Sequence, residues 1–344
     1  MGAQRAVSAL NSLRVYVHTA PAPRWRRYLQ ELLDPAVRLI WGPSLPDPAD
    51  YEILVAGRPS REMLEASPRL RTLIIPWVGL PPSTRELLHD FSHVAVHNLH
   101  HNAVAAAEMA VALLLAAAKF LVPMDRALRR NDWRPRYEPN PAVRLDGRTA
   151  LILGYGAIGR RVGAACRGLG MHVVGVRRHP HPAPEDGVKV HPPEALHALL
   201  PRADALVIAL PHTPETDGLL GAEELALLPP RAVLVNVARG PIVEQKALYH
   251  ALREGTLHAA GLDVWYHYPS GRDAGYGVEE VRAHTPPADY PFHELDNVVM
   301  SPHRAGGLHT EATERDRMEH LARLLNAAAR GKPMPNRVDL DLGY

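Results

Sequence analysis

Two side chains suited to chemistry on a carbonyl group, Arg239 and His303, each follow a short apolar segment in the second half of the chain. A third segment of this kind is followed by Asp263. In an open parallel sheet the carboxyl ends of the strands lie along one edge, and ligands bind there. A guanidinium at that edge can bind a carboxylate and polarise a carbonyl, and an imidazole can transfer a proton. The pattern therefore predicts that Arg239 and His303 converge on one substrate. The ordinary alternatives are a structural ion pair and a hydrogen-bonded histidine at a strand end.

A glycine-rich turn, Gly154–Gly159 (GYGAIG), directly follows the apolar segment Ala150–Leu153 and opens a helical pattern. The first glycine permits a tight turn, the second lets the backbone approach a pyrophosphate, and the third allows close contact between helix and sheet. The helix N-terminus then faces the negative charge of the phosphates. This context predicts a dinucleotide site. Its candidate contacts are Gly154, Gly156, Ala157 and Gly159.

The next apolar segment ends in Arg177 and Arg178. A site for NAD normally has Asp or Glu at this place, about 20 residues after the glycine turn, to bind the ribose 2′-hydroxyl. A carboxylate would repel a 2′-phosphate, whereas guanidinium groups pair with phosphate. Charge therefore favours NADP as the cofactor. NAD stays open as the alternative, with both arginines as solvated surface charges.

The composition excludes several classes of protein. Lys and Arg number 39 against 37 Asp and Glu, and the net charge of +2 does not indicate a partner such as nucleic acid. The single cysteine, Cys166, excludes an internal disulfide and is typical of a cytoplasmic protein. The longest apolar stretch, Ala103–Val122, contains two charged residues, and the N-terminus does not resemble a secretion signal, so no membrane segment is expected. No metal is expected either, because the pair His100-His101 has no partner at ligand spacing.

The elements that must position these residues form two alternating series of strands and helices, which indicates an α/β fold with largely parallel sheets. The predicted strands are Leu13–Val17, Val37–Trp41, Ile53–Ala56, Leu73–Ile75 and Val94–His97, then Ala150–Leu153, Val173–Val176, Ala205–Leu210, Ala232–Val235, Ala259–Leu262 and Val298–Met300. The predicted helices include Arg24–Leu33, Arg61–Ala66, Glu108–Phe120, Ile158–Leu169 and Thr310–Ala329.

The order of these motifs resembles that of the D-isomer-specific 2-hydroxyacid dehydrogenase family, from about Leu70 to the C-terminus and more loosely before it. The matching pieces are Gly154–Gly159, Leu210–Thr216, Asn236–Gly240, Gly261–Val264 and Pro302-His303. The resemblance implies that Arg239 binds the carboxylate and keto oxygen of the substrate, that His303 is the general acid/base, and that Asp263 lies near the nicotinamide. It also implies substrate contacts at Val78, Gly79 and Asn102, and cofactor contacts at Ile158, Pro211, Thr216 and Val237.

The expected fold is thus two Rossmann-like domains with parallel sheets and a cleft between them. Residues 1–103 and 304–344 are expected to form the substrate-binding domain, and residues 104–303 the dinucleotide-binding domain. The expected activity is hydride transfer between NADP(H) and a small 2-hydroxy or 2-oxo acid, in a homodimer. The Ala/Leu-rich segment Glu108–Phe120 fits a dimer interface and an internal core equally well.

One position departs from the family pattern. The family usually has a glutamate that hydrogen-bonds to the catalytic histidine, and Tyr268 stands there, five residues after Asp263. An insertion around residues 270–286, with the carboxylates Asp273, Glu279 and Glu280, also lies beside the site. If nothing replaces the glutamate, His303 should titrate near an ordinary histidine, and reduction should slow as the pH passes about 6.5.

Three accounts of this departure stay open. Tyr268 hydrogen-bonds to His303 and serves as a third catalytic residue; or a carboxylate from the insertion, or Glu294, takes that role; or catalysis is weakened and the protein is a nucleotide-sensing regulatory binder. A formate- or phosphite-type dehydrogenase is the enzymatic alternative, because Asp263-Val264-Trp265 looks like the formate branch of the family.

Overall fold

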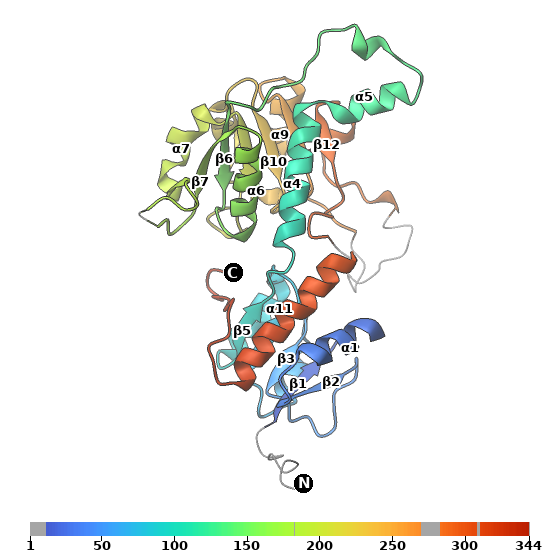
Figure 1. Cartoon of the computed structure of the whole chain (residues 1–344), viewed down its shortest axis with the longest axis vertical. Helices are drawn as coiled ribbons and strands as arrows, with labels where there is room; N and C mark the ends of the chain where they lie inside the picture. Colours follow the sequence, from blue (N-terminus) through green and yellow to red (C-terminus); the bar gives the residue numbers. More distant parts are fainter. Residues whose placement is uncertain (1–11, 182, 270–282, 308–309, 344) are drawn as a thin grey trace. The chain divides into compact units, whose positions relative to one another are not determined.

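The computed structural model describes residues 12–181, 183–269, 283–307 and 310–343 (Figure 1). The chain forms two compact units. The smaller contains Met1–Asn102 and Leu308–Tyr344, and the larger contains Ala103–Gly307. Each has one sheet whose strands all run parallel, so the α/β class with two parallel sheets is confirmed.

The sheet of the smaller unit has the strand order β2-β1-β3-β4-β5. Its strands are β1 (Leu13–Val17), β2 (Val37–Trp41), β3 (Ile53–Val55), β4 (Thr72–Ile75) and β5 (Ala95–Asn98). The helices of this unit are α1 (Pro23–Leu32), α2 (Arg61–Glu65), α3 (Pro82–Leu88) and α11 (Glu311–Ala329). In Figure 1, α1 and α11 lie side by side across the sheet.

Successive residues of β1 face opposite sides of this sheet, as the period of a strand requires. Val15 and Val17 pack with Leu29 of α1 and Leu325 of α11. Tyr16, between the two valines, packs with buried residues of α2 and α3 in a second cluster. Both faces of the sheet are therefore covered, which explains why most residues of its strands are apolar.

The sheet of the larger unit has the strand order β12-β11-β10-β9-β6-β7-β8. Its strands are β6 (Thr149–Leu153), β7 (His172–Val176), β8 (Lys189–His191), β9 (Ala205–Ile208), β10 (Val233–Asn236), β11 (Ala259–Leu262) and β12 (Val298–Met300). The helices are α4 (Ala103–Ala118), α5 (Leu121–Leu128), α6 (Ala157–Gly168), α7 (Leu196–Leu199), α8 (Ala222–Ala226) and α9 (Gln245–Arg253). The chain order reverses between β6 and β9, and in sheets of this kind nucleotides bind at that reversal.

Two layers of helices cover the larger sheet. Residues of α4 and α6 share one buried cluster with alternate strand residues, and residues of α7, α8 and α9 share the other. The helix α4 packs closely on β11, because a Cβ added to Gly261 would lie 2.7 Å from the Cβ of Leu113. The expectation that the Ala/Leu-rich helix is buried holds for the face of α4 that packs on the sheet, where eight of its 16 residues are buried.

Element boundaries differ from the sequence predictions in a few places. The helix predicted over Glu108–Phe120 starts at Ala103 and ends at Ala118, because Phe120 adopts a left-handed conformation with φ of 51°. Pro123 is then accommodated in the first turn of a new helix, α5, where its missing N–H costs no hydrogen bond. The short strand β8 and the helix α3 were not predicted.

Among the described residues, no single helix is long and apolar enough to cross a membrane. The helices α4 and α5 meet the length and composition criteria only as a pair, and they are bent by 66° relative to each other.

Candidate active site

The glycine turn between β6 and α6 can form only with glycines at two of its positions. Gly154 has φ of +94°, and a Cβ there would lie 2.5 Å from the nitrogen of Leu210, just after β9. A Cβ on Gly159 would lie 2.2 Å from the carbonyl oxygen of Gly154. The turn therefore lies at the reversal between β6 and β9, and α6 packs directly on it.

The middle glycine faces open space. A Cβ added to Gly156 would meet no atom within 4 Å. Gly156 is also the N-cap of α6, which begins at Ala157, and it makes no side-chain cap. The first amides of the helix are therefore left for a ligand, and the geometry fits the pyrophosphate of a dinucleotide. Ile158, the next predicted contact, is half-buried.

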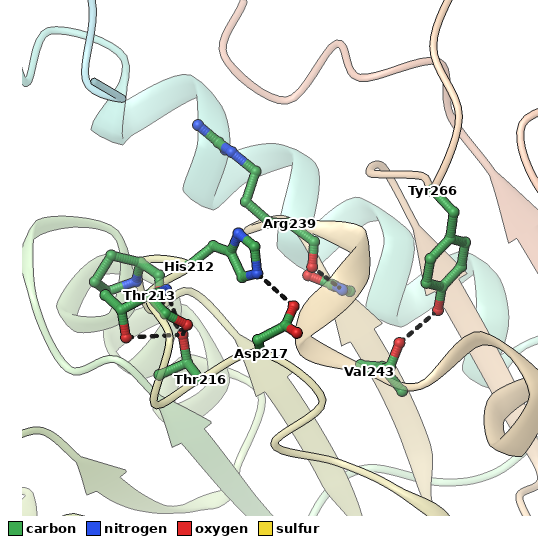
Figure 2. A network of polar contacts seen from close by, with 9 residues as sticks. His212, Thr213, Thr216, Asp217, Arg239, Val243 and Tyr266 are labelled. Atoms are coloured by element: carbon green, nitrogen blue, oxygen red, sulfur yellow. Dashed lines mark hydrogen bonds and ion pairs between the residues drawn. The ribbon is translucent and has the colours of Figure 1, made fainter. Parts of the chain in front are cut away.

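The loop after β9 is shaped by the hydroxyl of Thr216. This hydroxyl donates to the carbonyl of Pro211 (2.9 Å) and accepts from the amide of Thr213 (2.8 Å), as Figure 2 shows in part. His212 forms a 2.7 Å hydrogen bond to Asp217 in the same loop. Pro211 is exposed, whereas Val237, predicted as a further cofactor contact, is buried.

Both arginines at the end of β7 take part in ion pairs. A guanidinium nitrogen of Arg177 lies 3.2 Å from each carboxylate oxygen of Glu185. Arg178 lies 3.7 Å from a carboxylate oxygen of Glu215. Each arginine is thus paired with an acidic residue that the sequence analysis did not single out.

The loop that carries Arg239 is held by the side chain of Asn236. This side chain donates to the carbonyl of Arg239 (2.9 Å) and accepts from the amide of Ala238 (3.0 Å). The next residue must be glycine, because a Cβ on Gly240 would lie 2.4 Å from the carbonyl oxygen of Trp265. Arg239 is exposed, and in Figure 2 its side chain points away from the strands of the sheet.

Asp263 is fully buried and holds the turn that carries His303. Its carboxylate accepts hydrogen bonds from the Ser301 hydroxyl and from the amides of Arg304 (2.8 Å) and Ala305 (2.9 Å). His303 adopts a left-handed conformation with φ of 56°, which is rare for a residue with a side chain. The carboxylate of Asp263 is thus used by the protein itself, which makes Asp263 a positioning residue.

Tyr268 contacts His303 through its ring. The ring centroids are 5.4 Å apart and the planes are inclined by 56°. The hydroxyl of Tyr268 accepts a 3.1 Å hydrogen bond from the amide of Trp265. The predicted hydrogen bond from Tyr268 to His303 is therefore not formed, because the hydroxyl faces the backbone of its own loop.

No side chain in the described part of the chain hydrogen-bonds to the imidazole of His303. Glu294, one predicted replacement for the glutamate, is exposed and ends the short helix Phe292–Glu294. The other candidates, Asp273, Glu279 and Glu280, lie outside the described residues.

Burial lowers the pKa of His303, the positive charge of Arg239 lowers it further, and the charge of Asp263 opposes both effects. Burial raises the pKa of Tyr268, and the charge of Arg239 acts in the opposite direction. These interactions place Arg239, Tyr268 and His303 within electrostatic reach of one another, beyond the ends of neighbouring strands. Burial and the charge of Arg239 thus both favour the neutral imidazole, in the direction of a pKa below that of an ordinary histidine.

The candidates in the smaller unit follow neighbouring strands, β4 and β5. The carbonyl of Val78, which precedes Gly79, accepts a 2.6 Å hydrogen bond from the side chain of Asn98. The side-chain oxygen of Asn102 is buried and has no hydrogen-bond partner among the described residues. A buried acceptor without a partner is costly, so Asn102 fits a site that receives a donor from a ligand.

Comparisons with known proteins show the family to which the chain is related. A family model described as D-isomer specific 2-hydroxyacid dehydrogenase, NAD binding domain, matches residues 111–305. A glyoxylate reductase of Korarchaeum cryptofilum is 37% identical over 242 residues, which cover 69% of this chain and 66% of that protein. A D-3-phosphoglycerate dehydrogenase of Methanocaldococcus jannaschii is 29% identical over 294 residues, which cover 85% of this chain and 52% of that protein. The chain therefore spans between about half and two thirds of the length of these relatives.

A solved structure gives the same result for the fold. The D-isomer specific 2-hydroxyacid dehydrogenase of Xanthobacter autotrophicus Py2, crystallised with NADPH and MES, superposes with a TM-score of 0.77 at 26% identity. The alignment covers 97% of this chain and 100% of that one.

Proposed function

The chain belongs to the D-isomer specific 2-hydroxyacid dehydrogenase family, and we propose that it transfers hydride between NADP(H), with NAD(H) as a second cofactor, and a small 2-hydroxy or 2-oxo acid. The observation that carries this proposal is the grouping of Arg239, Tyr268 and His303 beyond the ends of β10, β11 and β12. A cation, an aromatic ring and a titratable imidazole at one sheet edge fit the chemistry of a 2-oxo acid.

The residues that would hold the cofactor surround the glycine turn. Gly156 and the first amides of α6 bind the pyrophosphate, and Arg177 and Arg178 lie where the adenosine ribose is expected. When bound, the reduced cofactor supplies the hydride for the keto carbon. A similar solved structure supports the NADP preference, since the Xanthobacter protein was crystallised with NADPH.

Residues of the chain itself would bind the substrate, polarise its carbonyl group and supply the proton. Arg239 pairs with the substrate carboxylate and donates a hydrogen bond to the keto oxygen, which polarises the carbonyl. His303, in its protonated form, gives that oxygen its proton. Tyr268 limits the rotation of the imidazole by ring contact, and Asp263 holds the turn. Val78, Gly79 and Asn102 of the smaller unit are proposed as further substrate contacts.

We also propose that the protein is a homodimer, with residues 121–137, which begin with α5, at the interface between the two copies. Four large apolar side chains of this segment are exposed: Leu121 (59%), Leu128 (50%), Trp133 (59%) and Tyr137 (80%). A second copy that packs against this surface would bury them. Sedimentation equilibrium of the chain tests this, with Trp133→Ala expected to raise the monomer fraction.

The proposed activity is tested with a panel of 2-oxo acids, each assayed with NADPH and NADH by absorbance. Arg239→Ala should lower kcat/KM by about 10²–10³-fold, because it removes a charged donor at the reacting oxygen. NADPH affinity should change little. The matched control is Arg231→Ala, an exposed arginine in the turn before β10. Full turnover by Arg239→Ala, or nucleotide binding without turnover of any 2-oxo acid, would contradict the proposal.

A further inference from the structure

Glu185 is a carboxylate that two arginines share at the edge of the proposed cofactor site. Each of its two carboxylate oxygens lies 3.2 Å from a guanidinium nitrogen of Arg177. The carboxylate also forms an ion pair with Arg160 of α6. Arg177 directly follows β7, and Arg160 directly follows the glycine turn. The side chain of Glu185 is only 9% exposed, whereas those of Arg160 and Arg177 are 44% and 36% exposed. The carboxylate is therefore well covered, and both guanidinium groups remain accessible.

A tight backbone turn fixes Glu185 in this position. Glu185 and Val188 exchange two backbone hydrogen bonds of 2.9 and 2.8 Å across the turn residues Asp186 and Gly187. These have positive φ values of 52° and 75°, and an Asp-Gly pair is favoured in such two-residue turns. Arg167 donates a further hydrogen bond to the carbonyl of Asp186. Three hydrogen bonds thus hold the backbone of the turn, and the ion pairs with Arg160 and Arg177 hold the carboxylate.

The sequence predicted only positive charge near the adenosine ribose, whereas the structure also has a carboxylate there. Arg177 is expected to bind a 2′-phosphate, yet Glu185 already supplies it with an anion. A carboxylate near the end of this strand is also what an NAD site uses to bind the ribose 2′-hydroxyl. In this chain that carboxylate comes from eight residues further on, beyond the two arginines.

We propose that Glu185 sets the cofactor preference by competing with the 2′-phosphate of NADP for Arg177 and Arg160, and by accepting a hydrogen bond from the 2′-hydroxyl of NAD. The inference rests on the proposed dinucleotide site and deepens it. It makes the protein able to use both cofactors, with Glu185 limiting the advantage of NADP.

The test measures dissociation constants of the full chain for NADPH and NADH by titration of intrinsic fluorescence. Glu185→Gln keeps the size of the side chain and removes its charge. The variant should bind NADPH about tenfold more tightly, a change typical of one charged interaction, and NADH equally or more weakly. The affinity for 2′,5′-ADP should rise in parallel, with a steeper dependence on salt. Glu185→Ala should change the affinities in the same direction.

Two controls make the result specific. Glu194→Gln removes the same charge from an exposed glutamate on the short helix Pro193–Ala195 and should leave both constants unchanged. In an Arg177→Ala background, Glu185→Gln should lose most of its effect on NADPH. Thermal unfolding of each variant shows that the fold is retained.

The outcomes separate this inference from the proposed function. Weaker NADPH binding by Glu185→Gln would show that Glu185 orients Arg177 for the phosphate, and it would overturn the competition. An unchanged ratio of the two affinities would overturn it as well, while the proposed function would stand. A wild-type chain that binds neither cofactor would overturn both.

Discussion

The backbone N–H of His303 donates a 2.8 Å hydrogen bond to the carbonyl oxygen of Asp263, the first residue after β11. The same aspartate binds the residues on both sides of the histidine through its carboxylate. His303 therefore has its strained backbone conformation because a buried acidic residue 40 positions earlier in the chain holds it. The proton donor of the proposed reaction is positioned by backbone hydrogen bonds as well as by side-chain contacts.

Asp263→Asn should damage both the fold and the reaction. One of its side-chain oxygens becomes an N–H₂ group, which cannot accept the amide hydrogen bonds of Arg304 or Ala305. We expect the free energy of unfolding to fall by about 1–3 kcal/mol, and kcat for reduction to fall more than KM rises. Ser301→Ala, which removes only the hydroxyl bond, should have a smaller effect on both. Urea unfolding and steady-state kinetics measure the two quantities. Wild-type kinetics in Asp263→Asn would contradict the positioning role.

The rate of reduction of a 2-oxo acid should increase as the pH falls. It needs protonated His303, and burial together with the Arg239 charge lowers the pKa of this imidazole below the usual value of about 6.5. The protonated fraction at pH 7 is therefore small and falls about tenfold for each further pH unit. We expect kcat/KM for a 2-oxo acid to rise as the pH falls below 6.5, whereas oxidation of the 2-hydroxy acid, which needs the neutral base, reaches its plateau near neutral pH.

A pH profile of kcat/KM in both directions tests this. Tyr268→Phe keeps the ring against His303 and removes only the hydroxyl, which bonds to Trp265, so the midpoint of its profile should not move. A reduction rate that stays flat above pH 8 would mean that another acidic group keeps His303 protonated.

Two tyrosines of the larger unit should respond oppositely to loss of their hydroxyl groups. Tyr155 lies in the core with a buried hydroxyl that has no partner among the described residues. The hydroxyl of Tyr266 donates a 2.8 Å hydrogen bond to the carbonyl of Val243 (Figure 2). Because an unsatisfied buried hydroxyl is costly and a satisfied one contributes, Tyr155→Phe should stabilise the protein and Tyr266→Phe should destabilise it, each by about 1 kcal/mol. Thermal and urea unfolding measure both changes, and a destabilised Tyr155→Phe would reveal a hydrogen bond to water.

The smaller unit should lose stability in mild acid. Burial, together with the nearby charges of Arg317, His320 and His100, lowers the pKa of His101 to about 4. The pKa values of His97, His100 and His320 are lowered as well. Between the unfolded pKa near 6.5 and the folded value, only the unfolded chain binds the proton, so stability falls as the pH falls through this range.

For His101 alone the loss approaches about 3 kcal/mol by pH 4. Urea midpoints at several pH values between 7 and 4 measure it. His101→Gln should flatten the pH dependence, and His93→Gln, an exposed histidine of the same unit, should not. Equal acid sensitivity in wild type and His101→Gln would assign the effect to other groups.

Most strands of both sheets were predictable because the feature that indicates a strand, a short run of apolar residues, is local in the sequence. The bounds of β1, β2, β11 and β12 agree with the apolar runs of the sequence, and the glycine turn lies where its spacing predicts. β8 was missed because Lys189–His191 has only one buried residue and carries charge, so its apolar signal is weak. The break between α4 and α5 was missed because Phe120 is apolar and gives no sign of a left-handed residue.

The sequence alone determined the α/β class, the glycine turn and the identity of Arg239 and His303 as candidates, since these depend on residue type and local spacing. Only the tertiary structure decided that Asp263 accepts hydrogen bonds from the turn that carries His303, and that Tyr268 contacts His303 through its ring. It also decided that Glu185 forms an ion pair with Arg177. The physical reason is that hydrogen bonds and ion pairs of this kind join groups from separate elements. Their partners are chosen by the direction of each side chain once the strands have paired.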